Sequence, residues 1–283
     1  MTIRIFTIAT NYYKEYFTEY FLPTINNIFK NHTKEVILFS DGLEEYNNKI
    51  YDNTCIHVKH IYDLYSFDIQ FNKFNFINQE LNNCNNNDLL IYADSDSMFC
   101  YNENAEKYIL DNYRLNKFYI SIHPIYLFDS EYTVNCEEVR QNVYSDTKLK
   151  GIFAYNLTEK PELITSFMVF NKQSFKEFFD AYNEEVYQMN KCVPRIMPTL
   201  NDEGIINYIY NVNKSNVDSK LFITINNNYE NNVFDNSIIY IPWMNDDIGI
   251  YHDADIKLDK NNYVICNQKF NYNIKKQNKF NNV

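Results

Sequence analysis

Residues 88–96 read DLLIYADSD, an apolar segment that ends in two aspartates separated by one serine. The residues from Leu89 to Ala93 carry no charge, and a short apolar run of this kind is typical of a strand buried within a sheet. Where such a strand ends in extended backbone, Asp94 and Asp96 point to the same side, so both carboxylates can approach one cation. The segment therefore predicts a central strand that brings two carboxylates to the edge of a sheet.

The residues before this strand alternate between strand and helix patterns. Apolar runs rich in β-branched residues predict strands at 3–9, 35–39 and 55–58, and helical spacing of apolar residues predicts helices at 14–30 and 71–81. Pro23 is expected to kink or divide the first helix. The alternation predicts an α/β fold, a mostly parallel central sheet with flanking helices. Ligands bind beyond the carboxyl ends of the strands in such sheets, where Asp41 and Asp94 fall.

Beyond residue 100 the same alternation continues less regularly. Strands are predicted at 118–122 and 166–170, and helices at 174–189 and 202–211. No internal repeat and no linker interrupts the chain. We therefore expect a single domain spanning residues 1–283.

The formal charge of −11 narrows the classes of partner. Binding to nucleic acid requires a concentrated basic face, which the sequence lacks, so no nucleic-acid partner is expected. An acidic protein that binds a diphosphate needs a metal bridge or a few well-placed cations. The six cysteines show no C-x-x-C spacing, which argues against zinc. No signal peptide or long apolar run is present, so a cytoplasmic protein with no transmembrane segment is expected.

Three other interpretations of the D-x-D motif can be weighed on the sequence. The two aspartates could simply be solvated loop residues, although a buried strand directly before them favours a metal site. A calcium-binding loop starting at Asp94 would need Gly and Glu where Phe99 and Ala105 stand, so that interpretation fails. A haloacid-dehalogenase-like phosphatase would use Asp94 as its nucleophile. In that fold the motif normally closes the first strand, whereas here a long strand-helix-strand region precedes it.

A second acidic group, Asn201-Asp202-Glu203, opens the helix predicted at 202–211. Carboxylates at this position often only stabilise the helix dipole. The functional interpretation is a carboxylate that stabilises or attacks an oxocarbenium-like centre, by analogy with retaining glycoside chemistry. His123, directly after a predicted strand, is either an acceptor-pocket residue or a structural histidine.

In their order along the chain, these segments resemble glycosyltransferase family 6, the family of the blood-group A and B transferases and the α-1,3-galactosyltransferases. The similarity is closer to the short, soluble bacterial and viral members. The matching segments are 8–13 (uridine-binding strand and loop), 68–73 (a basic residue near the donor), 92–99 (the metal motif), 122–133 (the acceptor side), 197–208 (the catalytic acidic segment) and 254–258.

The resemblance implies a GT-A-type fold, a UDP-sugar donor, Mn²⁺ (or Mg²⁺) as cation, and retention of anomeric configuration. It implies that Asp94 and Asp96 bind the metal, with Asp94 also contacting the donor, and that Asp202 and Glu203 are catalytic. It places Ile8, Ala9, Thr10, Tyr13 and Lys73 at the nucleotide, and His123, Thr165, Ser166 and Asn201 at the donor or acceptor sugar. The acceptor is then a saccharide, a glycolipid or a lipooligosaccharide, reached at the membrane surface where it is lipid-linked.

The same resemblance divides the chain into a nucleotide-binding half (1–100), an acceptor and catalytic half (101–260) and a basic tail (261–283). The tail either folds over the diphosphate or is disordered, and both interpretations stay open. Two departures affect specificity. Leu200-Asn201 replaces the family's Trp-His, and the segment at 165–171 lacks the family's glycines. Phe167 is expected near the C2 substituent of the sugar, which favours galactose or glucose over an N-acetylated hexose such as N-acetylgalactosamine.

The expected function is thus metal-dependent, retaining hexosyl transfer from a UDP-sugar. An alternative from a different class is a non-catalytic module that binds sugar nucleotides or glycans with the same fold. The retained D-x-D and Asp-Glu pairs favour the enzyme.

Overall fold

The computed structural model of the chain describes residues 1–62, 66–99, 103–112, 116–122, 163–191, 202, 205, 206, 209, 222–225, 239–240 and 265–267. The strands are β1 (Ile3–Ala9), β2 (Lys34–Ser40), β3 (Ile50–Tyr51), β4 (Thr54–His60), β5 (Leu89–Ala93), β6 (Ser97–Phe99), β7 (Phe118–Ile122), β8 (Leu163–Phe170), β9 (Phe222–Ile225), β10 (Ile239–Tyr240) and β11 (Ile265–Asn267). The helices are α1 (Tyr13–Tyr16), α2 (Leu22–Thr24), α3 (Ser66–Glu80), α4 (Glu103–Asn112) and α6 (Lys172–Lys191), with a π-helical turn at Phe17–Phe21 and 3₁₀ turns at Ile25–Asn27, Glu44–Tyr46 and Leu81–Asn83.

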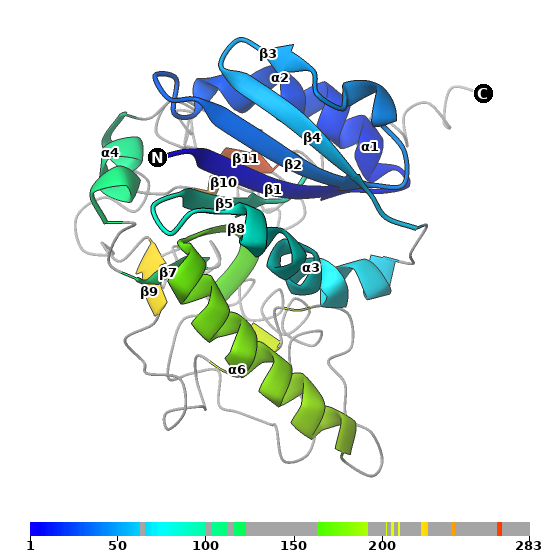
Figure 1. Cartoon of the computed structure of the whole chain (residues 1–283), viewed down its shortest axis with the longest axis vertical. Helices are drawn as coiled ribbons and strands as arrows, with labels where there is room; N and C mark the ends of the chain where they lie inside the picture. The colour runs from blue at the N-terminus through cyan, green and yellow to red at the C-terminus, as the bar shows by residue number, and fades with distance from the viewer. Residues whose placement is uncertain are drawn as a thin grey trace, which may run out of the picture.

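The main sheet has eight strands in the order β3-β4-β2-β1-β5-β8-β7-β9 (Figure 1). Strands β4, β2, β1 and β5 run parallel to one another, and β9 runs parallel to β7. Strand β8 is antiparallel to both β5 and β7. The structure is compatible with the predicted α/β fold: the core of the sheet is mostly parallel, while the sheet as a whole is mixed. The reversal at β8 was not predicted, because an apolar strand carries no signal for its own direction.

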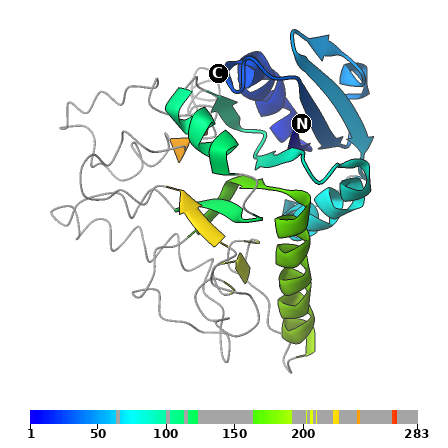
Figure 2. The same cartoon turned by 60° about the vertical axis from the view of Figure 1, so that its left-hand side comes forward.

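Side chains of alternate strand residues pack on opposite faces of this sheet, as the two-residue period of a strand requires. On β1, Ile3 and Ile5 join one hydrophobic cluster, and Phe6 and Ile8 join the other. The first cluster is covered by the helical segment at 13–27, and the second by α3 and α6 (Figures 1 and 2). The central strands are therefore buried on both faces, which explains the continuous apolar run of β5.

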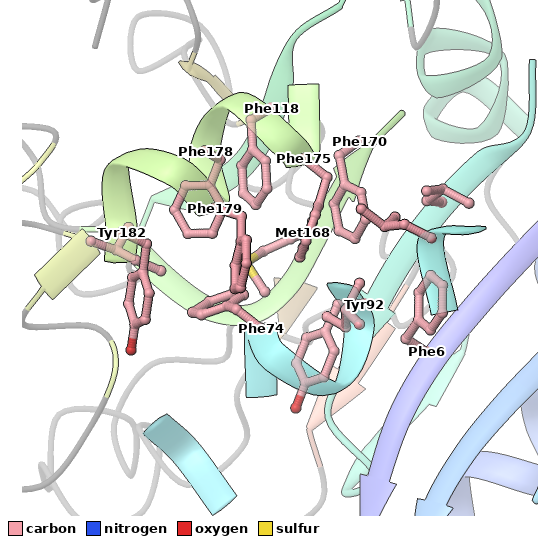
Figure 3. Close-up of a cluster of buried hydrophobic side chains, with 14 of the residues drawn as sticks. Phe6, Phe74, Tyr92, Phe118, Met168, Phe170, Phe175, Phe178, Phe179 and Tyr182 are labelled. Atoms are coloured by element: carbon pink, nitrogen blue, oxygen red, sulfur yellow. The ribbon is translucent and has the colours of Figure 1, made fainter. Parts of the chain in front are cut away.

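An aromatic cluster fixes α3 and α6 against the sheet (Figure 3). Phe118 of β7 stacks on Phe170 of β8 with 5.2 Å between ring centroids, and it contacts Phe178 of α6 at 4.4 Å. Phe74 of α3 meets Tyr182 of α6 at 4.8 Å. Burial of each Phe ring contributes roughly 1.5–3 kcal/mol. This packing fixes the position of α3, and with it the position of Lys73, the residue directly before Phe74.

The helical segment after β1 is divided, which is one of the two alternatives predicted for Pro23. In place of one helix over 14–30, the structure has successive short turns from Tyr13 to Asn27. Pro23 lacks the N–H that a continuing α-helix needs and lies at the start of α2. The π-helical turn just before it brings Phe17 and Phe21 into a stacked contact at 5.3 Å.

Strands β1 and β7 match their predicted ranges, and the remaining predicted elements are found with shifted ends. Helix α3 begins at Ser66 and β8 at Leu163, both earlier than predicted, and α6 extends past both predicted ends. Of the helix predicted at 202–211, the described residues 205, 206 and 209 are helical. No helix in the described part of the chain is both long and apolar enough to cross a membrane.

Candidate functional site

Parallel strands of the main sheet end at one edge, and polar residues follow three of them. Thr10 follows β1, Asp41 follows β2 and Asp94 follows β5, with β1 paired to both neighbours in parallel register. Asp41 forms an ion pair with Lys14, with 3.1 Å between Oδ1 and Nζ. This edge is where parallel α/β sheets bind ligands, and it defines the candidate site.

The D-x-D motif is held in place by its backbone. The Ser97 N–H donates to the Asp94 carbonyl at 3.1 Å, which closes a tight turn, and the Asp94 N–H donates to the Ser166 carbonyl of β8 at 3.0 Å. The side chain of Asp96 is only 3% exposed. The alternative of two solvated loop aspartates does not hold for Asp96, because the turn buries it at the sheet edge.

Strand β5 also supplies a partner for the first carboxylate of the motif. The Tyr92 hydroxyl donates a hydrogen bond of 2.7 Å to Asp94 Oδ1. The two residues lie two positions apart, so the strand period places them on the same face. Burial, then the charge and hydrogen bond of Asp94, raise the pKa of Tyr92 well above its ordinary value. The phenol therefore remains a protonated donor.

A buried ion pair lies next to this tyrosine. Lys73 Nζ of α3 is 2.9 Å from Asp202 Oδ2 and 3.2 Å from Thr165 Oγ1 of β8. The ammonium group also lies over the Tyr92 ring, 4.6 Å from its centroid. Lys73 and Asp202 are 4% and 2% exposed. Lys73, predicted at the nucleotide, is therefore in direct contact with Thr165, predicted at the sugar, and with Asp202, predicted to be catalytic.

Tyrosines from the segment after β1 line the other side of the motif. Tyr13 stacks on Tyr12 with 4.4 Å between ring centroids and lies 5.7 Å from the ring of Tyr16. Burial, then the charge of Asp96, raise the pKa of both Tyr13 and Tyr16, and Asp94 raises that of Tyr13 further. The region around Tyr13 therefore has a negative potential that a bound cation would relieve.

The remaining nucleotide-side predictions fall at the end of β1. Ile8 and Ala9 are buried on opposite faces of the sheet, in the two hydrophobic clusters. Thr10 is 2% exposed and its carbonyl accepts a hydrogen bond of 2.9 Å from the Tyr13 N–H. These residues form the strand end and turn that place Tyr13 beside Asp96.

Strand β8 carries three residues that were predicted near the sugar, and one of them does not lie where it was predicted. Thr165 contacts Lys73, as above, and Ser166 is 6% exposed, with no hydrogen-bond partner for its hydroxyl among the described residues. Phe167 is fully buried in the hydrophobic cluster that contains Ala93. Its ring packs inside the core, so the expectation that it restricts the sugar's C2 substituent is wrong. The preference for galactose or glucose that rested on it is dropped.

Three predicted site residues, His123, Asn201 and Glu203, lie outside the described residues. Their roles stay predictions. The carbonyl of the neighbouring Asp202 accepts hydrogen bonds from the N–H groups of Ile205 and Ile206 at 3.2 and 3.1 Å. Asp202 is thus attached to a helical turn that is buried against the aromatic cluster.

The C-terminal tail predicted at 261–283 contributes one described strand. Strand β11 pairs antiparallel with β6, with Cys266 opposite Met98 and Asn267 opposite Ser97. Residues from this tail therefore lie beside the strand that directly follows the D-x-D motif. Lys275, Lys276 and Lys279 lie outside the described residues.

Sequence reasoning missed two residues around the Lys73–Asp202 pair. Tyr92 contacts Asp94 and Lys73. The sequence could have indicated this role, because a tyrosine two positions before an aspartate at a strand end points to the same side as that aspartate. Tyr182 of α6 is 2% exposed, and burial, then the charge of Asp202, raise the pKa of its phenol well above the ordinary value. Nothing in the helical pattern around Tyr182 distinguishes it from a core residue.

The carboxylates of Asp94 and Asp96 have the chemistry that suits a hard divalent cation, but a turn closed by the Ser97 N–H replaces the extended backbone from which their common direction was predicted. Such ions are bound through one or two carboxylates together with the oxygens of a substrate phosphate, and carboxylate ligands suit Mg²⁺ and Mn²⁺. Asp94 Oδ1 accepts the Tyr92 hydrogen bond, and no described contact uses Oδ2. Within the described ranges no group of three or more His, Cys, Asp or Glu gathers.

In comparisons with known proteins, no model of a protein family and no curated protein matches the chain.

Proposed function

We propose that this chain is a metal-dependent, GT-A-type glycosyltransferase that moves a hexose from a UDP-sugar to a saccharide acceptor with retention of configuration. The observation that carries the proposal is the buried contact between Lys73 and Asp202. The two residues belong to segments that resemble separate parts of the family 6 donor site, and they meet beside the strand that ends in Asp94. The mostly parallel sheet is compatible with the GT-A type.

In the proposed reaction the bond between the anomeric carbon and the UDP oxygen breaks, an acceptor hydroxyl forms the new bond, and its proton passes to the leaving UDP phosphate. Asp94 and Asp96 would hold the cation, which when bound neutralises charge on the diphosphate. Asp202, oriented by Lys73, accepts hydrogen bonds from hydroxyls of the donor sugar. Glu203 stabilises the positive charge at the anomeric carbon or attacks it.

The nucleotide end of the donor is assigned to the turn after β1. Tyr13 is held beside Asp96 by the turn at Thr10, and the resemblance places Tyr13 and Thr10 at the uracil. The hexose is galactose, glucose or N-acetylgalactosamine, because the buried position of Phe167 removes the argument against an N-acetyl group. Ser166, with a buried hydroxyl next to Thr165, is then a candidate partner for the sugar.

A thermal-shift screen with UDP, UDP-sugars and GDP-sugars, each with and without Mn²⁺, tests this proposal. A ligand at about 100 times its Kd stabilises the native state by roughly 2.7 kcal/mol. We expect the melting temperature to rise with UDP-sugars only when Mn²⁺ is present. An unchanged melting temperature with every UDP-sugar in both conditions contradicts the proposal.

A second measurement separates the enzyme from a non-catalytic binding module of the same fold. A transferase of this type slowly transfers its sugar to water, so UDP is released from the donor in the absence of acceptor. A binding module shows the same thermal shift but releases no UDP. The acceptor proposed here is a saccharide, or a glycolipid or lipooligosaccharide reached from the cytoplasm.

A further inference from the structure

Tyr92 occupies a position that none of the assigned roles uses. It is 3% exposed, on a strand whose other residues are all buried and apolar, yet it carries a hydroxyl group. A buried hydroxyl is costly unless it has a hydrogen-bond partner. The partner of Tyr92 is the carboxylate of Asp94, at 2.7 Å. The polar atom of this core residue therefore faces the D-x-D motif.

The hydrogen bond limits how the Asp94 carboxylate can turn. It engages Oδ1 and leaves Oδ2 without a hydrogen bond in the described part of the chain. Hydrogen bonds to ionised acceptors are shorter and about twice as strong as neutral ones, and 2.7 Å falls in their range.

The ring of the same residue contacts the ion pair on its other side. Lys73 Nζ lies 4.6 Å from the Tyr92 centroid while it binds Asp202 and Thr165. A cation over an aromatic ring in a desolvated site is attracted by the ring's negative face. One buried side chain thus touches the carboxylate assigned to the metal and the lysine that the resemblance assigns to the nucleotide.

We propose that Tyr92 is a positioning residue that orients the Asp94 carboxylate for a divalent cation. The inference rests on the proposed function, because it takes Asp94 as a metal ligand. Groups that hydrogen-bond to a ligating carboxylate fix its orientation, and their removal typically lowers metal affinity by about 10- to 100-fold. A purely structural tyrosine here would need only its ring, which phenylalanine supplies equally well.

The test uses Tyr92→Phe in the full chain, with Mn²⁺ binding in the presence of UDP measured by calorimetry. Phenylalanine preserves the buried ring, and circular dichroism and the melting temperature confirm that the variant is folded. Tyr182→Phe is the matched control, because it removes another buried hydroxyl near Asp202 that has no described hydrogen-bond partner. Asp94→Asn is the reference for a lost ligand.

We expect Mn²⁺ affinity to fall about 10- to 100-fold in Tyr92→Phe and to stay at the wild-type value in Tyr182→Phe. UDP release titrated with Mn²⁺ should need more metal for half-maximal rate in Tyr92→Phe, with the plateau largely retained. Wild-type Mn²⁺ affinity in a folded Tyr92→Phe, with binding lost in Asp94→Asn, overturns the positioning role alone. Absence of Mn²⁺ binding in the wild type overturns the metal-dependent function together with it.

If Tyr92→Phe is not folded, 4-aminophenylalanine in place of Tyr92 provides a second variant, because its amino group keeps a donor at the position of the hydroxyl. Mn²⁺ affinity near the wild-type value in this variant supports hydrogen bonding as the cause. A folded variant of this kind that binds Mn²⁺ as weakly as Asp94→Asn contradicts it.

Discussion

Lys73 and Asp202, 129 residues apart in the sequence, form a buried ion pair with 2.9 Å between Nζ and Oδ2. Both side chains are almost fully excluded from solvent. Removing two charges from water is expensive, and their attraction offsets the cost only when further hydrogen bonds support the pair. Thr165 supplies one such bond at 3.2 Å, and the Tyr92 ring contacts the ammonium group. The pair ties α3 to the acidic segment of the site.

Replacing Lys73 with Met should therefore destabilise the protein strongly, because the Asp202 carboxylate is left buried without its counter-charge. We expect a loss of roughly 3–5 kcal/mol in the free energy of unfolding, measured by urea denaturation. Lys14→Met is the control, since it removes a more exposed pair with Asp41 and should cost about 0–1 kcal/mol. Equal effects of the two substitutions contradict the importance of the buried pair.

A large part of the fold followed from local sequence patterns. The apolar run before Asp94 gave the position of β5, because a strand buried on both faces is continuously apolar, and shorter apolar runs gave β1, β2 and β4. Parallel order could be expected from the intervening helices. Since parallel strands end at a common edge, the site at the ends of β1, β2 and β5 could be predicted before any contact was known.

Contacts between distant segments could not be read in this way. Nothing in the local pattern around Lys73 indicates Asp202 as its partner, because the contact depends on how α3 packs against β8 and α6. The same holds for Phe167, whose orientation depends on the strand alternation set by its pairing with Ala93. The π-helical turn before Pro23 also exceeds what apolar spacing can specify.

Asp94→Asn or Asp96→Asn should abolish Mn²⁺-dependent binding of UDP while the protein stays folded. Asparagine keeps the shape of each side chain, and its amide oxygen can still accept the Tyr92 hydrogen bond at position 94. What is lost is the negative charge that a divalent cation requires. Calorimetry of UDP in the presence of Mn²⁺ measures the effect.

Asp111→Asn is a suitable control for these substitutions, because it removes an exposed carboxylate from α4. It should leave UDP affinity at the wild-type value. If Asp94→Asn and Asp96→Asn also retain that affinity, the two aspartates do not bridge a metal to the nucleotide.

From the buried side chain of Lys34 we predict a pH dependence of stability that does not involve the candidate site. Its side chain is fully buried, and Nζ donates to the Ile28 carbonyl at 2.8 Å. Burial lowers the pKa of Lys34 from 10.5 to about 8, against the smaller effects of Glu106 and Asp52. Between these values the unfolded chain binds more protons than the folded protein, so the contribution of Lys34 to stability rises with pH.

The measurement compares wild type with Lys34→Met by urea denaturation at several pH values from 8 to 10. We expect the free energy of unfolding of the wild type to rise relative to that of the variant across this range. Titration of the remaining groups cancels in the difference. A difference that stays constant, or that falls with increasing pH, contradicts the lowered pKa of Lys34.

Glu203→Gln tests the proposed chemistry most directly. Glutamine keeps the size and the hydrogen-bonding oxygen of the side chain but removes the charge that would stabilise the anomeric centre in the transition state. Interactions made only in the transition state affect turnover rather than binding, so donor affinity should be retained while UDP release falls by roughly a hundredfold or more. The melting temperature in UDP-sugar with Mn²⁺ reports donor binding in the same samples.

Glu177→Gln, on the exposed face of α6, is the control and should turn over at the wild-type rate. Near-normal turnover in Glu203→Gln would restrict this glutamate to stabilising the dipole of the helix that follows it.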